Sequence, residues 1–295
     1  MFGIGRYIKK DLVDTFLGFF KKNFFKSIYP VLLFLTSKRN FKKAINRKKL
    51  FIKYDANIDS INKHEYKFTS QNNEDGIIEH IFSLVDNSKT FVEIGFEFTE
   101  NNSLHLIKQG WKGILIDSNF DTCLKMRQCL DYFYPHHEVK VINEKVNKNN
   151  INKLVFDNIR EQHIDFFSID LDGNDYWILE NLNLKVFNVI CCEYNPFFGN
   201  THKRTIPYDV NFVYKGDYYF GASLNTYADL LKKNSFDLIA VDSSGTNAFF
   251  VNNQYSKIFD VLEPSYSFKK SGRHSDQEIS EISSELFNKY KLINL

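Results

Sequence analysis

Acidic and amide side chains follow five short apolar segments of this 295-residue sequence. The segments have the composition of buried strands, and they end at Glu93, at Asp117, near Asn143, at Asp170 and at Glu193. In an open α/β sheet, ligands bind beyond the carboxyl ends of the parallel strands. We therefore expect this edge of the sheet to hold a ligand that carboxylates recognise, such as a ribose or a metal ion.

Asp117 follows Gly95 by about 22 residues, a spacing at which a carboxylate can accept both hydroxyls of a ribose. The same residue could equally cap the next helix. Gly95 is the one glycine of the first loop, whereas a dinucleotide fingerprint needs three. S-adenosylmethionine has no phosphate, so the glycine-poor loop favours this cofactor over NAD. The expected cofactor contacts are Glu93, Gly95, Glu97, Asn102, Asp117, Ser118, Asn143 and Asp170.

Carboxylates crowd the end of the fourth segment, where Asp170, Asp172 and Asp175 stand within six residues. Such groups repel each other unless a cation or donors offset the charge, and oxygen ligands suit Mg²⁺ or Ca²⁺. A divalent ion there could hold two sugar hydroxyls and lower the pKa of one. The alternative is a structural turn, with Asp175 capping the next helix. The candidate metal ligands are Asp170, Asp172, Glu193 and Asn195.

A catalytic base is expected close to these strand ends. The insert 194–220 follows the fifth segment, and loops that a rigid sheet positions often carry substrate contacts. The candidates are Asp170, Asp172, Tyr194 and His202. Gln71, Glu74 and Asp75, which precede the first strand, could either cap a helix or line the pocket.

Strand and helix patterns alternate in the part of the chain that must position these residues. Predicted strands at 90–95, 112–117, 138–143, 164–170 and 186–193 alternate with helices at 77–85, 101–109, 120–132, 151–161 and 176–182. After the insert come a helix at 222–233 and two strands, 237–241 and 248–251, joined by a tight turn. This order predicts a doubly wound, mostly parallel sheet with an antiparallel pair at one edge.

Eight segments resemble successive motifs of the FkbM-like methyltransferases of bacterial polysaccharide and natural-product gene clusters. They are residues 70–82, 90–107 (TFVEIGFEFTENNSLHLI), 110–117, 166–178 (FFSIDLDGNDYWI), 191–199, 205–209, 220–224 and 243–251. The resemblance implies a class I methyltransferase of the Rossmann-like type, with S-adenosylmethionine at Gly95 and Asp117. Glu97 and Thr99 stand where methyltransferases usually have glycines.

Charge is divided unevenly along the chain. Residues 1–53 hold 14 Lys or Arg against two Asp, a net +12, and the remainder carries −10. An acidic body argues against nucleic acid as a partner. The basic, Phe-rich segment 1–53 could bind an anionic membrane surface without spanning it, or pack on the body or on a second subunit of a homo-oligomer. No cysteine pair has metal-site spacing, and a cytoplasmic location, with peripheral contact at the inner face of the membrane, is the expectation.

The domain expectation is a basic, aromatic, helical extension (1–60), a Rossmann-like domain (61–262) and a C-terminal loop and helix (263–295). Within the extension, Leu12, Phe16, Phe19 and Phe20 recur at helical spacing. Pro30 should break or kink the pattern, and a second helix is expected at 39–53. A polar linker is expected at 54–70.

The predicted function is O-methylation of a hydroxyl on a sugar, nucleotide-sugar or glycan acceptor. S-adenosylmethionine is the expected cofactor, and a divalent cation such as Mg²⁺ is a candidate second cofactor. Two alternatives remain open at this stage. One is a non-catalytic protein that binds a nucleoside or glycan in surface-polysaccharide assembly. The other is a metal-dependent hydrolase that uses the acidic strand ends.

Overall fold

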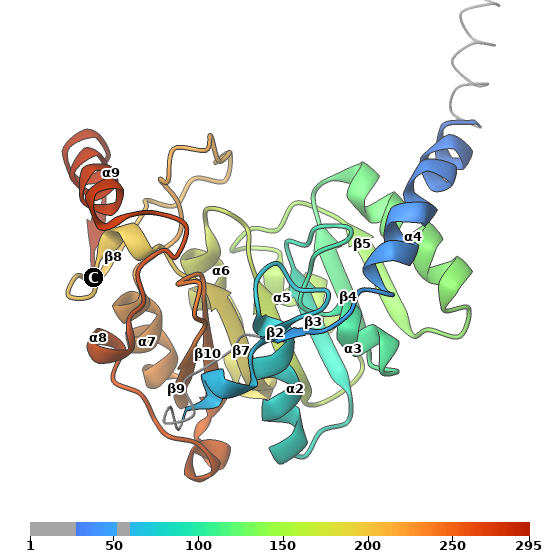
Figure 1. Ribbon diagram of the computed structural model, residues 1–295, viewed down its shortest axis with the longest axis horizontal. Coiled ribbons are helices and arrows are strands. Elements are labelled where there is room, and N and C mark those ends of the chain that lie inside the picture. Colours follow the sequence, from blue (N-terminus) through green and yellow to red (C-terminus); the bar gives the residue numbers. More distant parts are fainter. Residues whose placement is uncertain (1–27, 52–59) are drawn as a thin grey trace, which may run out of the picture.

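The central feature of the computed structural model, which describes residues 28–51 and 60–295, is a seven-stranded sheet (Figure 1). Its order is β5-β4-β3-β6-β7-β10-β9. Strands β3 to β7 are parallel, and β10 is antiparallel to both of its neighbours. The strands are β3 (Thr90–Ile94), β4 (Lys112–Asp117), β5 (Val139–Asn143), β6 (Ile164–Ile169), β7 (Phe187–Glu193), β9 (Phe236–Val241) and β10 (Asn247–Asn252).

Helices cover both faces of this sheet, as the alternation of elements predicts. Successive strand residues face opposite sides, so Phe91 lies in one core and Val92 in the other. Helices α2 (Glu74–Leu84), α3 (Leu104–Lys108) and α4 (Phe120–Phe133) bury their apolar side chains in the first core. Helices α5 (Ile151–Phe156), α6 (Asp175–Asn181) and α7 (Leu224–Lys233) bury theirs in the second. The doubly wound, mostly parallel sheet is confirmed.

Residues 28–44 form a helix, here called the N-terminal helix, that packs along α4. Phe41 is fully buried, with its ring centroid 5.5 Å from those of Phe98 and Phe133. The helix continues through Pro30 without a break, and of the helix expected at 39–53 only residues 39–44 are helical among those that the structure describes. Pro30 lies within the helix, and the chain leaves it after residue 44 to form β1 (Leu50–Phe51). The helix predicted around Leu12–Phe19 lies outside the described residues.

The polar segment before α2 is ordered rather than a linker over the residues that the structure describes. It contains η1 (Ile61–His64) and β2 (Tyr66–Lys67), which pairs with β1. Its polar side chains serve buried hydrogen bonds: the Asn62 amide donates to the Val241 carbonyl at 2.8 Å, and Glu65 accepts from the Ser243 amide at 2.9 Å. This segment has few apolar residues, so the hydrophobic pattern of the sequence did not indicate that it packs on the rest of the protein.

The C-terminal segment folds against the insert that follows β7. Leu286 of α9 (Asp276–Lys289) packs with Phe197, Phe198 and Ile206, and β11 (Ile293–Asn294) pairs with β8 (Arg204–Thr205). The remaining short elements are η2 (Leu184–Val186), η3 (Pro196–Phe198), η4 (Asn253–Ile258) and α8 (Pro264–Ser267). Among the helices within residues 28–51 and 60–295, none combines the length and apolar character needed to cross a bilayer.

Candidate functional site

A pocket of about 520 Å³ opens at the carboxyl edge of the parallel strands. It is bounded by the loops after β3, β4, β6 and β7, by the insert, and by the segment before α9. Most of the residues singled out in the sequence line it. These are Glu93, Gly95, Glu97, Asn102, Asp117, Ser118, Asp170, Asp172, Glu193 and Tyr194.

Gly95 is required by a close approach between two strands. It adopts a φ of +73°, and a Cβ atom there would lie 1.6 Å from the backbone oxygen of Asp170. Only glycine can adopt this positive φ and, because it lacks a Cβ atom, lie so close to the Asp170 backbone without strain. The end of β3 is thereby held directly against the acidic turn after β6.

Glu93 shapes the first loop from within. Its carboxylate accepts hydrogen bonds from the backbone amides of Asn102 and Ser103, each at 2.9 Å, and from the Ser103 hydroxyl. Burial raises the pKa of Glu93 to about 7, against the opposing effect of those donors. Glu93 therefore holds the loop, and its neighbour Asn102 donates a further bond to Ser168 Oγ at 3.0 Å.

Asp117 lies at the end of β4 with its side chain partly buried in the pocket wall. It accepts a hydrogen bond from the Asn119 amide at 2.6 Å, and burial raises its pKa. The cap of α4 is Asn119, whose side chain accepts from the Thr122 amide at 3.0 Å. Asp117 is therefore not the residue that caps α4. Asn143 lies beside it, donating to the Asp117 carbonyl at 3.0 Å, but does not line the pocket.

Three carboxylates of the pocket lining lie close together. One oxygen from each of Asp170, Asp172 and Glu193 lies within 4.8 Å of the others. Burial and the neighbouring acids raise the pKa of Asp170 to about 8 and that of Glu193 well above its usual value. Glu193 Oε2 is buried and has no hydrogen-bond donor among the described residues. The cluster can therefore hold a cation or accept hydrogen bonds from a ligand.

Asp175 has the structural role that the sequence left open. Its carboxylate accepts from the backbone amides of Leu171 and Gly173 at 2.7 and 3.0 Å, and burial raises its pKa to about 6. These bonds shape the turn that carries Asp172, which adopts a φ of +52°.

Three predictions about individual residues do not fit the structure. The amide of Asn195 donates to the carbonyls of Tyr218 and Phe220, and its oxygen accepts from the Phe197 amide, so this buried side chain braces the insert and is not free to bind a metal. Tyr194 reaches the pocket, but its hydroxyl donates to the Lys269 carbonyl at 2.6 Å and is not free to act as a base. His202 is exposed outside the pocket, beside Phe287.

A tyrosine–histidine pair in the pocket lining was not found from the sequence. The Tyr218 hydroxyl is 3.0 Å from His274 Nε2, and His274 Nδ1 is 2.9 Å from Ser271 Oγ. Both rings line the pocket, and Tyr218 adopts a φ of +60°, a strained conformation that is often found at functional sites. The two residues come from the insert and the C-terminal segment, so no local motif joins them.

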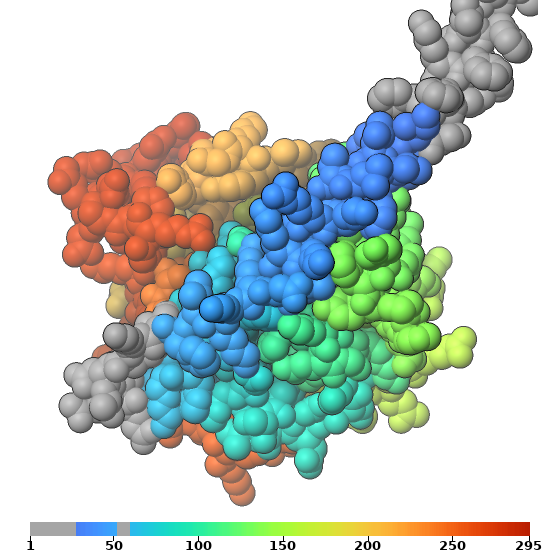
Figure 2. Space-filling model, turned by 45° about the vertical axis from the view of Figure 1, so that its right-hand side comes forward, coloured from blue at the N-terminus to red at the C-terminus, as the bar shows by residue number. Residues whose placement is uncertain are grey.

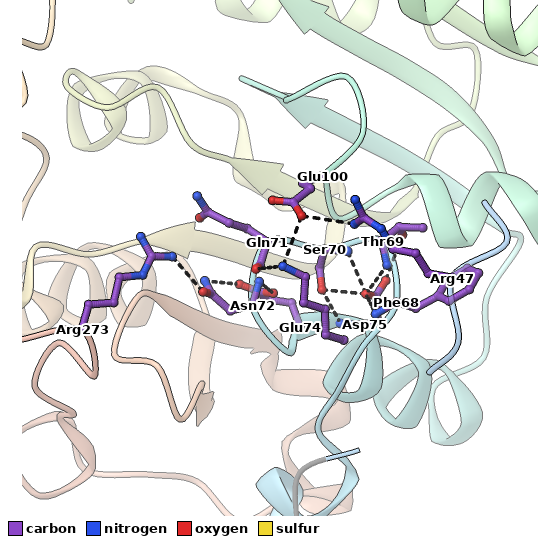
Figure 3. Close-up of polar contacts among 11 residues, drawn as sticks. Arg47, Phe68, Thr69, Ser70, Gln71, Asn72, Glu74, Asp75, Glu100 and Arg273 are labelled. Carbon is purple, nitrogen blue, oxygen red and sulfur yellow. Dashed lines mark hydrogen bonds and ion pairs between the residues drawn. The ribbon is translucent and has the colours of Figure 1, made fainter. Parts of the chain in front are cut away.

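The loop before α2 forms another side of the pocket (Figure 3). Asp75 holds it through the backbone amides of Phe68, Thr69 and Ser70 at 2.7–2.8 Å. Gln71 and Glu74 then line the pocket, whereas Asp75 does not.

Both ends of this loop are tied to distant parts of the chain. Arg273 donates to Asn72 Oδ1 at 3.0 Å on one side, and on the other Lys67 pairs at 3.3 Å with Glu100, which Arg47 also binds at 3.2 Å (Figure 3). The pocket lining therefore combines residues from Gln71 to His274, which lie 203 positions apart in the sequence.

The strand order identifies the architecture. Five parallel strands are followed by a reversed β10 inserted between β7 and β9, which is the arrangement of class I methyltransferases. The fold is the Rossmann-like fold of that class.

Of the known proteins compared with this chain, only solved structures match it. No protein-family model and no curated protein sequence matches this chain. The chain is similar to the N-terminal domain of EvdMO1 with SAH bound (TM-score 0.42, 10% identity, 72% of this chain and 93% of that one). It is also similar to magnesium protoporphyrin IX methyltransferase from Synechocystis PCC 6803 with bound SAM (0.39, 8%, 77% and 96%) and to an O-methyltransferase from Bacillus cereus in complex with SAH (0.35, 14%, 55% and 72%). At such low values the similarity carries no argument about activity.

Proposed function

We propose that this protein is an S-adenosylmethionine-dependent O-methyltransferase, of the FkbM-like kind, that modifies a hydroxyl of a sugar or glycan. The observation that carries the proposal is the predominance of acidic side chains in a pocket at the ligand-binding edge of a Rossmann-like sheet. Eight acidic residues line it against one arginine, Arg273. The acids are Glu74, Glu93, Glu97, Glu100, Asp117, Asp170, Asp172 and Glu193.

This charge balance disfavours a dinucleotide, whose phosphates would meet carboxylates in place of the donors that bind phosphate. S-adenosylmethionine has a sulfonium, an ammonium and one carboxylate, so an acidic pocket attracts it. In this proposal Asp117 accepts the ribose hydroxyls, and Gly95 lines the same pocket.

The acceptor half of the pocket is aromatic. Phe197, Tyr214, Tyr218 and Phe220 line the pocket together with Asp170 and Glu193. Apolar ring faces with a few convergent polar groups form the usual lining of a small-molecule site. A sugar ring can pack on the aromatic rings while its hydroxyls donate to the two carboxylates. The motif resemblance to polysaccharide-cluster enzymes favours such an acceptor and a cytoplasmic location.

S-adenosylmethionine, when bound, supplies a methyl group that is already strongly electrophilic. This protein must then hold the acceptor oxygen in line with the bond between the methyl group and the sulfonium sulfur, and remove the proton from that oxygen. We assign the proton to the Tyr218–His274 pair, since Ser271 fixes the imidazole and both rings reach the pocket. The acceptor oxygen would gain the methyl group as its bond to the sulfonium sulfur breaks, which would leave S-adenosylhomocysteine, and His274 would take the hydroxyl proton.

A divalent cation at Asp170, Asp172 and Glu193 is a subsidiary part of the proposal. The spacing of the three oxygens and the unpartnered Glu193 Oε2 fit a hard cation such as Mg²⁺. A bound ion would lower the pKa of an acceptor hydroxyl. Mn²⁺ titration followed by electron paramagnetic resonance should show one site in the wild type and a loss of affinity in Asp172→Asn. Equal binding by both proteins would remove the metal from the proposal.

Methyl transfer from radiolabelled S-adenosylmethionine to a panel of sugars and nucleotide sugars tests the proposal as a whole. Label in a sugar product supports it. A protein that binds glycans but not S-adenosylmethionine would be the non-catalytic alternative. Cleavage of substrates without S-adenosylmethionine, abolished by chelator, would instead identify the metal-dependent hydrolase.

A further inference from the structure

We propose that the outer face of the N-terminal helix docks on an anionic phospholipid bilayer. The observation behind the proposal is the division of this helix into a buried face and an outer face of unusual composition. Phe34, Ser37, Phe41 and Ala44 lie at helical spacing and pack on α4 and its neighbours. The rest of the helix surface faces solvent (Figure 2).

The first turns of the outer face are apolar. Val31, Leu32 and Leu35 are 55%, 52% and 51% exposed, although each is large and apolar. They lie within one turn of each other; Leu32 and Leu35 are on the side opposite Phe41, and Val31 flanks them. Single exposed apolar residues are ordinary, whereas three that adjoin on one helix mark an interaction surface.

The following turns of the same face are basic. Arg39, Lys42 and Lys43 are exposed, and Lys48 follows just after the helix. Within the described part of the chain none of these four forms an ion pair, unlike Arg47 and Lys49, which bind Glu100 and Glu79. No acidic residue occurs in 28–51. An apolar tip beside unpaired lysines matches an interfacial helix that inserts its apolar side chains among anionic headgroups.

Charge and size favour a bilayer over other partners. A second copy of this chain would need a face of roughly 20–30 residues to form a stable dimer, far more than this strip offers. Nucleic acid would leave the apolar residues without a partner. The body beyond residue 53 carries −10, so an anionic membrane attracts the basic strip and repels the rest, which fixes the orientation.

Docking would bring the pocket close to the headgroups. The Tyr29 hydroxyl donates to Asp121 at 2.6 Å, and Asp121 lies in the first turn of α4, four residues after Asp117. The apolar end of the N-terminal helix is therefore at the same edge of the sheet as the pocket, and it extends beyond that edge (Figure 1). A site in that position could act on acceptors attached to lipids.

Vesicle flotation of the full-length protein tests the proposal. The protein should float with phosphatidylcholine vesicles that contain about 30% phosphatidylglycerol at low salt, and much less at about 0.5 M salt or without the anionic lipid. The double variants Leu32→Asp/Leu35→Asp and Lys42→Glu/Lys43→Glu should each lower the partition coefficient roughly tenfold or more.

Matched controls separate a local effect from net charge. Lys153→Glu/Lys257→Glu changes net charge equally at exposed positions away from the N-terminal helix, and Val261→Asp replaces an apolar residue of similar exposure. Both should float like the wild type, and all variants should keep its melting temperature. Flotation that the helix variants leave unchanged would overturn the proposal. So would a concentration-dependent dimer that those variants abolish, because the partner would then be a second copy.

Discussion

Gly95 and Asp170 lie in direct backbone contact: a Cβ atom on Gly95 would come within 1.6 Å of the Asp170 carbonyl oxygen. Asp170 in turn donates its own amide to the Ile94 carbonyl at 2.9 Å. The loop that faces the proposed cofactor and the turn that carries the acidic cluster are thus a single rigid unit. A substitution in the loop should therefore displace the turn as well, because no flexible side chain separates the two backbones.

Replacing Gly95 should therefore strongly lower the stability of the folded protein. Gly95→Ala adds both backbone strain and a clash, and we expect the free energy of unfolding to fall by about 3 kcal/mol or more. Gly110→Ala is the matched control, because Gly110 has a φ of +81° but nothing within 4 Å of its Cβ position. It should cost only about 1–2 kcal/mol. Urea denaturation of both variants measures the difference, and equal losses would contradict the contact.

Buried carboxyls should make stability fall between pH 6.5 and 8. The pKa values of Glu93 and Asp242 are raised to about 7, and that of Asp170 to about 8. The folded state therefore holds protons that the unfolded state has lost, and ionising each group costs up to about 1.4 kcal/mol per pH unit. The histidines with lowered pKa, namely His64, His80 and His105, act in the opposite direction but only below pH 6.5.

Urea denaturation across that pH range, in chelator, measures this slope. Asp170→Asn should flatten the slope between pH 7 and 8, because an amide cannot ionise. The exposed Asp260→Asn should leave it unchanged. Stability that rises from pH 6.5 to 8 in the wild type would show that these carboxyls are not protonated in the folded protein.

His274 is predicted to act on the acceptor and not on the cofactor. His274→Ala should lower kcat for methyl transfer roughly 10²–10⁴-fold, the usual contribution of a general base, with little change in S-adenosylmethionine affinity. A fall in kcat that is relieved at high pH would further indicate a lost base. His202→Ala is the control and should behave like the wild type. If the two variants lose activity equally, the Tyr218–His274 pair has no special role.

The sheet and its ligand-binding edge were predictable because they depend on local patterns. Each buried strand is a short apolar run, and β4 has the predicted bounds. Asp117 and the Asp170–Asp172 turn follow from the rule that parallel strands end at one edge.

The direction of loop side chains was not predictable in the same way. Asn195 turns inward because the Tyr218 and Phe220 carbonyls need a donor, and the Tyr194 hydroxyl is held by Lys269. His274 meets Tyr218 from 56 residues away in the sequence. These contacts depend on how the insert and C-terminal segment pack together, which no periodicity encodes.

The most direct test of the central claim is calorimetric titration of the protein with S-adenosylmethionine. We predict one site per chain, and NAD should not compete for it. Asp117→Ala should weaken binding by about 1.5–3 kcal/mol, the range for losing hydrogen bonds to a charged group, whereas Asp131→Ala on the exposed side of α4 should bind like the wild type. Absence of binding by the wild type, or the same affinity in Asp117→Ala, would contradict the account.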